Sequence, residues 1–146
     1  MVVELRIKKV FIFVIVLCLF VNFCCYSIAE NVTKKSIEIF KKKIASCNEI
    51  SALVRCGEEL NIASSKVGEE YIGELLLKSH WMHKQLAMYF IAKHGINRYV
   101  KDVGRIAGGT IECDRYNFGQ FLPIYALYVL SSFDCEEAQE IIRRIV

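Results

Sequence analysis

Two different patterns of apolar residues divide the chain. Residues 10–29 contain no charged side chain and are continuously apolar up to Val21. From Thr33 onward, apolar residues instead recur at every third or fourth position, which is the period of an amphipathic helix. Strand-like alternation is scarce, and the chain has a single proline. The pattern therefore predicts one long apolar segment followed by an all-α domain.

The apolar segment has the layout of a signal peptide. Arg6, Lys8 and Lys9 precede it, and Ser27 and Ala29 place small residues three and one before Glu30. A basic start, an apolar middle and small residues at the end are typical of a cleavable leader. We therefore expect residues 1–29 to be a signal peptide and residues 30–146 to be a single exported domain, periplasmic or secreted. The alternative is an uncleaved membrane anchor, because a helix of this length spans about 30 Å.

The periodicity and the residues that cap helices predict about seven helices. Gly95 is expected at the left-handed C′ position of one helix, and Asn97 is expected to cap the next. Asp134 and Glu137 resemble a capping box for the last helix. The helix with Pro123 in its first turn is apolar nearly all round, which predicts a central position with Leu127 deeply buried. The expected helices cover, in order, residues 33–46, 51–60, the segment after Ser65, 80–94, 97–107, the segment after Gly119 and residues 134–145.

An internal similarity suggests how these helices pack. Residues 86–91 match residues 125–130 at an offset of 39 residues, which lies in the range of helix-pair repeats. Residues 126–130, a short turn with Asp134, and then Ala138, Ile141 and Ile142 resemble a HEAT-like repeat. The resemblance implies stacked helical hairpins with a binding surface. We therefore expect a compact bundle of antiparallel helical hairpins, with a HEAT-like stack and an irregular helical bundle as the two alternatives for its packing.

Four cysteines lie outside the predicted leader: Cys47, Cys56, Cys113 and Cys135. An even number of cysteines in an exported domain predicts disulfides. We favour Cys47–Cys56 and Cys113–Cys135, because each pair joins neighbours in the sequence. A metal site is disfavoured, because there is no C-x-x-C pair.

The charge balance excludes one class of partner. Without the leader, the domain has sixteen Lys and Arg and fifteen Asp and Glu. Its net charge near +1 provides no drive toward nucleic acid. The membrane is expected as a partner only if the leader stays uncleaved.

Few residues suggest chemistry, and more suggest an interface. There is no nucleophile, metal or phosphate-binding motif, so we expect neither an enzyme nor a cofactor. Arg, Tyr and Trp are enriched at protein interfaces. We therefore expect a partner-binding site that combines the loop of residues 108–119 with the start of the predicted helix of residues 80–94. The candidate residues are Arg115, Tyr116, Asn117, Trp81 and His83.

These features favour a small exported α-helical protein-binding domain. In size, leader and cysteine content it is similar in style to periplasmic immunity proteins, which block secreted toxins or cell-wall hydrolases. The alternatives are a carrier of a small apolar ligand and a structural helical-repeat protein. For the loop of residues 108–119, the alternative is that Tyr116 and Phe118 fold back on the core.

Overall fold

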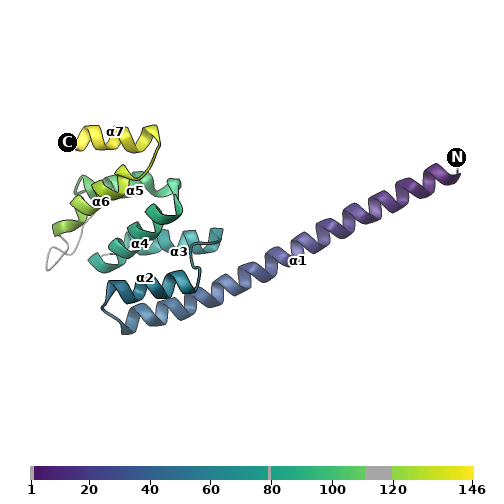
Figure 1. Cartoon of the computed structure of the whole chain (residues 1–146), viewed down its shortest axis with the longest axis horizontal. Coiled ribbons are helices and arrows are strands. Elements are labelled where there is room, and N and C mark those ends of the chain that lie inside the picture. Colours follow the sequence, from purple (N-terminus) through teal and green to yellow (C-terminus); the bar gives the residue numbers. More distant parts are fainter. Residues whose placement is uncertain (1, 79, 111–119) are drawn as a thin grey trace.

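The computed structural model describes residues 2–78, 80–110 and 120–146. Within these ranges the fold is entirely helical, with seven α-helices, one short 3₁₀ helix and no strand (Figure 1). This confirms the predicted all-α class. The α-helices are α1 (Val2–Ser46), α2 (Ile50–Glu59), α3 (Lys66–Leu77), α4 (Trp81–His94), α5 (Val100–Ala107), α6 (Leu122–Ser131) and α7 (Glu136–Ile145), and the 3₁₀ helix η1 spans Asn97–Tyr99.

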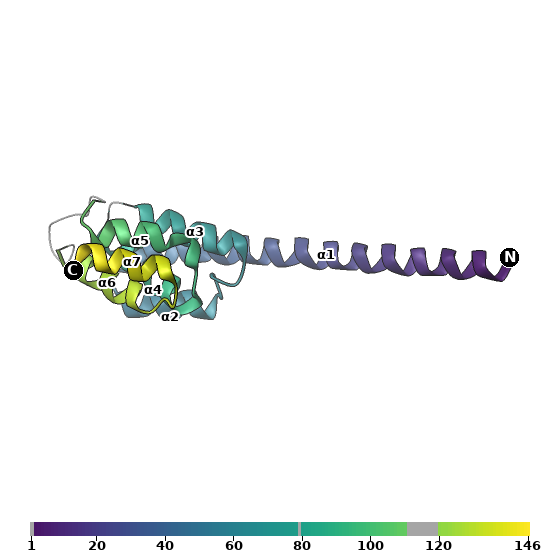
Figure 2. The ribbon, with the colours of Figure 1, turned by 90° about the horizontal axis from the view of Figure 1, so that it is seen from above.

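The helices form hairpins that lie one above another in Figure 1. Helix α3 packs on α4, and α5 packs on α6. Between hairpins, α1 contacts α3, α2 contacts α4, and α4 contacts α6. Seen from above in Figure 2, α3 and α5 lie on one side and α2, α4 and α6 on the other, and α7, which is uppermost in Figure 1, lies over α5 and α6. One side of the domain is therefore formed by α2, α4 and α6.

Aromatic rings join α1 and α2 to the hairpin formed by α3 and α4. Phe40 of α1 and Phe90 of α4 are both fully buried, and their rings meet edge to face with centroids 6.3 Å apart. Phe40 also meets Tyr71 of α3 at 6.4 Å in the same geometry. A Cβ atom at Gly57 would lie 2.5 Å from the Phe90 ring, so the glycine lets α2 approach α4 closely. Phe90 of α4 thus contacts both α1 and α2.

Some predicted helix ends are confirmed and others are wrong. Gly95 ends α4 with φ 61°, and the Ser65 side chain caps α3 by accepting from the Gly68 N–H. Asn97 does not cap α5, because η1 intervenes and α5 begins after Tyr99. The N-cap of α7 is Cys135 rather than Asp134, and it makes no side-chain capping bond.

Helix α1 is far longer than the segment predicted for the domain. It runs without a break through positions 29 and 30, where the Thr33 hydroxyl donates to the Ala29 carbonyl at 3.0 Å and Lys34 pairs with Glu30 at 2.7 Å. Among the described residues, Ile15–Ser46 is the stretch long and apolar enough to cross a membrane, with a mean hydropathy of 1.8 in its most apolar window. No residue in this most apolar part of α1 is buried in the protein.

The predicted Cys47–Cys56 disulfide is wrong. Cys47, Cys56 and Cys135 are free thiols. Cys47 lies in the connection between α1 and α2, whereas Cys56 lies inside α2, and the two sulfur atoms are not within bonding distance. Cys113, the predicted partner of Cys135, lies outside the described residues.

The predicted deep burial of Leu127 is also wrong. Helix α6 buries Leu122, Ala126, Val129 and Leu130, whereas Leu127 is only half-buried. The reason is that α6 lies on the side of the domain, so one part of its surface faces away from the other helices.

This difference in burial predicts unequal effects of two identical substitutions. Leu130→Ala should lower the free energy of unfolding by about 2–5 kcal/mol, because Leu130 is fully buried and truncation leaves a cavity. Leu127→Ala should cost clearly less, since that site is open to solvent on one side. Denaturant unfolding of the two variants measures both values, and equal losses would contradict the placement of α6.

Candidate functional site

The residues predicted to bind a partner are only partly described. Arg115, Tyr116 and Asn117 lie outside the described residues. Trp81 and His83 lie in the first turn of α4 and are half-buried. The Trp81 ring stacks on that of His80 with centroids 5.8 Å apart. The start of α4 is therefore occupied by an aromatic cluster, as the sequence indicated.

His83 belongs to a cleft rather than to an open surface. The cleft has a volume of about 520 Å³ and lies between α1, α3 and the start of α4. Its polar lining includes Lys41, Tyr71, Glu74 and His80. The His83 Nδ1 atom is buried and has no hydrogen-bond partner in the described part of the chain. No group of three or more metal-ligating side chains occurs among the described residues.

The environment of His83 predicts an acid-sensitive fold. Burial lowers the pKa of His83 below its ordinary value of 6.5, and the charges of His80 and Lys78 lower it further. The unfolded chain therefore binds this proton more readily than the folded one. Stability should fall as the pH drops through about 6.5 toward the lowered value. Thermal melting across this range should show a flatter pH dependence for His83→Gln than for the natural chain, and an unchanged slope would contradict this assignment.

A second surface, on α6, was not predicted. Phe121 just before α6 and Ile124 and Tyr128 within it are 53%, 67% and 72% exposed. Their spacing of three and four residues places them on one side of the helix. Tyr125 stacks on Tyr128 with centroids 6.4 Å apart. A groove of about 470 Å³ runs beside them, bounded by Gln85 of α4. We call this surface the tyrosine face and define it by Gln85, Tyr89, Phe121, Ile124, Tyr125 and Tyr128.

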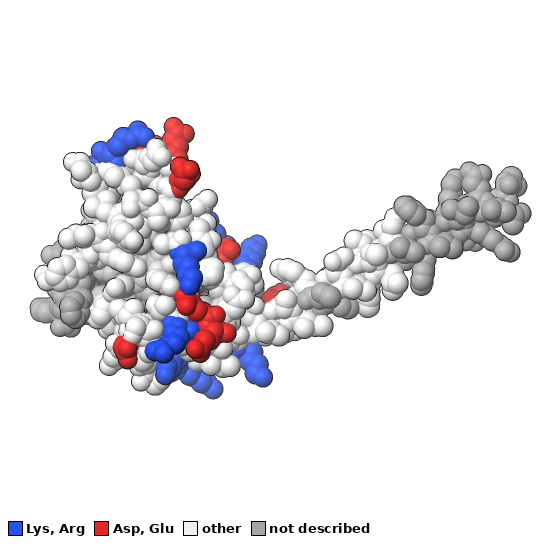
Figure 3. All heavy atoms as spheres, viewed as in Figure 1, with Lys and Arg blue, Asp and Glu red and all other residues white. Residues whose placement is uncertain are grey.

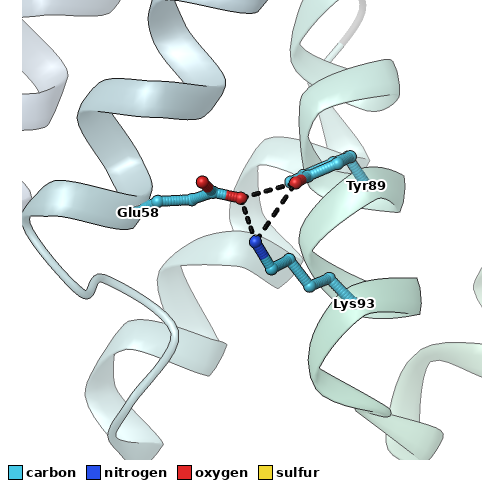
Figure 4. Close-up of polar contacts among 3 residues, drawn as sticks. All are labelled: Glu58, Tyr89 and Lys93. Carbon is cyan, nitrogen blue, oxygen red and sulfur yellow. Dashed lines mark hydrogen bonds and ion pairs between the residues drawn. The ribbon is translucent and has the colours of Figure 1, made fainter.

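Tyr89 connects the tyrosine face to α2. Its hydroxyl donates to the Glu58 carboxylate at 2.5 Å, and Lys93 pairs with the same carboxylate (Figure 4). The hydrogen bonds from Lys93 and Tyr89 lower the pKa of Glu58, and the bond to Glu58 raises the pKa of Lys93. Both groups therefore stay charged and neutralise each other at neutral pH. The two charged side chains at the edge of the tyrosine face, Glu58 and Lys93, therefore carry no net charge together.

The tyrosine face itself is uncharged. In Figure 3 the surface over α6 shows neither Lys and Arg nor Asp and Glu, whereas charges gather over α7 and over the lower part of the domain. Burial raises the pKa of Tyr125, and its neighbours Tyr128 and Tyr89 raise it further, so its hydroxyl stays protonated at neutral pH. The face therefore combines aromatic area with neutral hydroxyl groups that donate and accept hydrogen bonds.

A third groove, between α5 and α7, has a different character. It has a volume of about 600 Å³, and Gly104 and Ile141 are among its lining residues. Lys101 on its rim pairs with Glu137 at 3.1 Å, and Arg144 pairs with Glu140. Arg105, the remaining charged residue of the lining, pairs with Asp102 at 3.5 Å, so the charged side chains of this groove already have partners within the chain.

A buried lysine was not expected from the sequence. Lys84 of α4 is 1% exposed, and its Nζ atom donates to the carbonyl of Leu76 at 3.2 Å. That carbonyl lies in the last turn of α3, where backbone acceptors lack helical partners. Lys84 therefore joins the end of α3 to α4, which is a structural role.

Comparison with protein-family models, with curated proteins and with solved structures finds no match to this chain.

Proposed function

We propose that this chain is a small exported α-helical protein-binding domain and that the tyrosine face is its binding surface. The observation that carries the proposal is the exposure of Phe121, Ile124 and Tyr128 side by side on α6. Contiguous exposed apolar surface on a soluble domain is typical of an interaction site. Tyrosine is also among the residues that contribute most to binding between proteins.

The binding surface rests on regular helices. Gln85 and Tyr89 come from α4, and Ile124, Tyr125 and Tyr128 come from α6, which packs on α4. Side chains held on packed helices lose little conformational freedom on binding. This rigidity supports a blocking role, in which the domain neutralises a secreted toxin or cell-wall hydrolase, as an immunity or inhibitor protein does. Such a role is binding and not catalysis.

Export is the second part of the proposal. The exposed apolar residues of α1 include Leu19 at 64% and Phe20 at 65%, and no other part of the described chain covers them. An apolar helix of this length is suited to the interior of a membrane, either in transit as a leader or as an anchor. Mass spectrometry of the protein from cells tests this. A mature N-terminus at Glu30, or an intact chain in the membrane fraction, supports the proposal. An intact chain in the cytosol contradicts it.

The HEAT-like repeat is the third part. The 39-residue offset matches α4 with α6 and α5 with α7. In the structure α4 packs on α6, and α5 packs on α7. Equivalent helices of a helical-repeat protein stack on one another in this way. This packing supports a short HEAT-like stack in which α2, α4 and α6 form the binding side.

The binding function is tested with matched variants. The natural chain, Ile124→Ser and Ile39→Ser are each used as bait against the exported proteins of the source cells. Ile39 is 47% exposed on α1 and lies outside the tyrosine face, so it controls for the loss of an exposed isoleucine. A protein captured by the natural chain and by Ile39→Ser, but not by Ile124→Ser, supports the proposal. Capture that is equal for all three baits contradicts it.

A further inference from the structure

We infer that the cleft between α1, α3 and the start of α4 binds an apolar α-amino acid in its zwitterionic form. This cleft shares no residue with the tyrosine face, so the inference goes beyond the proposed function and does not depend on it. The observation that points to it is an apolar lining that lies beside two opposite charges, neither of which has an ion-pair partner in the described part of the chain.

The cleft has the size and the lining of a small-molecule site. Such sites have volumes of about 300–1,000 Å³ and combine apolar walls with a few polar groups. This cleft has a volume of about 520 Å³. Its buried lining residues are Tyr71, Leu75 and Met82, and Ile44 adds a further apolar side chain. The lining therefore suits a ligand with a small hydrocarbon group.

The charges of the cleft point to a ligand that carries both signs. Three charged residues line it, and one of them, Lys41, pairs with Glu38 at 2.8 Å. The other two, Glu74 and Lys78, are exposed and have no ion-pair partner among the described residues. A ligand with a single charge would be attracted by one of these groups and repelled by the other. A zwitterion is attracted by both.

The two charges lie beside different neighbours. Lys78 lies near the histidine pair, because burial, followed by the charges of His80 and Lys78, lowers the pKa of His83. Glu74 lies near Tyr71, since burial, followed by the charge of Glu74, raises the pKa of that hydroxyl to about 12. The Lys78 end of the cleft therefore suits a carboxylate, and the Glu74 end suits an ammonium group.

The histidines add hydrogen-bond donors to the Lys78 end. The Nδ1 atom of His80 accepts from the Met82 N–H at 3.3 Å, so the neutral ring has its proton on Nε2. The buried Nδ1 atom of His83 has no partner, whereas buried polar atoms almost always have one. Hydrogen bonding at this end is thus incomplete within the chain. An ionised carboxylate only accepts hydrogen bonds, so it matches donors on Lys78 and His80.

Three water-soluble probes with the same hydrocarbon group test the inference. L-leucine has both charges, isocaproate lacks the ammonium group, and isoamylamine lacks the carboxylate. Each is titrated into the full chain in detergent micelles, which cover the apolar part of α1. Calorimetry measures binding, and so does the fluorescence of Trp81, the one tryptophan of the chain, whose ring stacks on His80. Leucine should bind saturably and at least about tenfold more tightly than either other probe.

Matched variants assign the two ends of the cleft. Lys78→Gln should weaken the binding of leucine and isocaproate but not that of isoamylamine. Glu74→Gln should weaken the binding of leucine and isoamylamine but not that of isocaproate. Lys66→Gln and Glu70→Gln, which make the same changes on α3 at positions that do not line the cleft, should leave all three affinities unchanged.

Three results would overturn the site. The first is no saturable binding of leucine, and the second is a single-charge probe that binds as tightly as leucine. The third is an affinity for leucine that neither Lys78→Gln nor Glu74→Gln lowers. Circular dichroism shows whether each variant is folded. None of these results bears on the tyrosine face, so the proposed function is tested separately.

Discussion

Phe90→Ala should lower the free energy of unfolding by about 3–5 kcal/mol. Phe90 is fully buried, meets the Phe40 ring at 6.3 Å and lies against Gly57. Its removal therefore leaves a cavity where α1, α2 and α4 meet. Because native domains are stable by about 5–15 kcal/mol, a loss of this size is a large part of the total. Equilibrium unfolding in denaturant measures it.

Phe121→Ala is the matched control for this prediction. It removes the same side chain, but Phe121 is 53% exposed on the tyrosine face. Its loss should cost less than about 1 kcal/mol of stability, since exposed positions contribute little. A loss at Phe121 as large as that at Phe90 would mean that the tyrosine face is part of the core.

Tyr128→Ala should weaken binding of the partner by about 2–4 kcal/mol, which is about 30-fold to 1,000-fold in affinity. Tyr128 is 72% exposed and stacks on Tyr125, so it offers a large aromatic area held in place by a neighbour. The melting temperature should hardly change, because Tyr128 makes little contact with the core. Calorimetry of binding and thermal melting, performed on the same variant, separate the two effects.

The control for Tyr128→Ala is Ile39→Ala, at an exposed site on α1. It should leave both affinity and melting temperature close to those of the natural chain. Equal affinity of Tyr128→Ala and Ile39→Ala would show that the partner does not bind on α6.

The order of the helices follows from the sequence, but the surroundings of α6 do not. Judged by their hydrophobicity alone, Leu122 and Ile124 are equally suited to burial. Hydrophobicity does not distinguish a side of the helix that packs on α4 and α5 from a side left for a partner. The structure makes the distinction, because α6 belongs to one side of the domain and Ile124 faces outward. Leu127 was misplaced for the same reason.

The failed predictions share a physical cause. The Cys47–Cys56 disulfide was inferred from the number of cysteines and the predicted compartment, whereas a bond requires the two sulfur atoms to meet, and here both stay free. The caps at Asn97 and Asp134 were inferred from residue type, whereas η1 and Cys135 occupy the positions just before α5 and α7. In each case the prediction used the number or type of residues, whereas the outcome depended on where the backbone places them.

The candidate site could be found only in part from the sequence. The sequence analysis placed the candidate site in residues 108–119 and at Trp81 and His83, whereas the surface proposed from the structure lies on α6 and includes neither Trp81 nor His83. The tyrosine face joins Tyr89 to Tyr125, which are far apart in the chain and meet only because α4 packs on α6. The spacing of Phe121, Ile124 and Tyr128 was the one sequence signal, since it marks a second apolar stripe on a helix that already has one.

The central claim is that another protein covers the tyrosine face in the cell. The most direct test replaces Tyr128 with a photoreactive phenylalanine derivative in the full chain and irradiates living cells. The same replacement at Ile39 is the control. The account predicts a discrete protein adduct at position 128 and none at position 39. No adduct at position 128, or the same adducts at both positions, would contradict it.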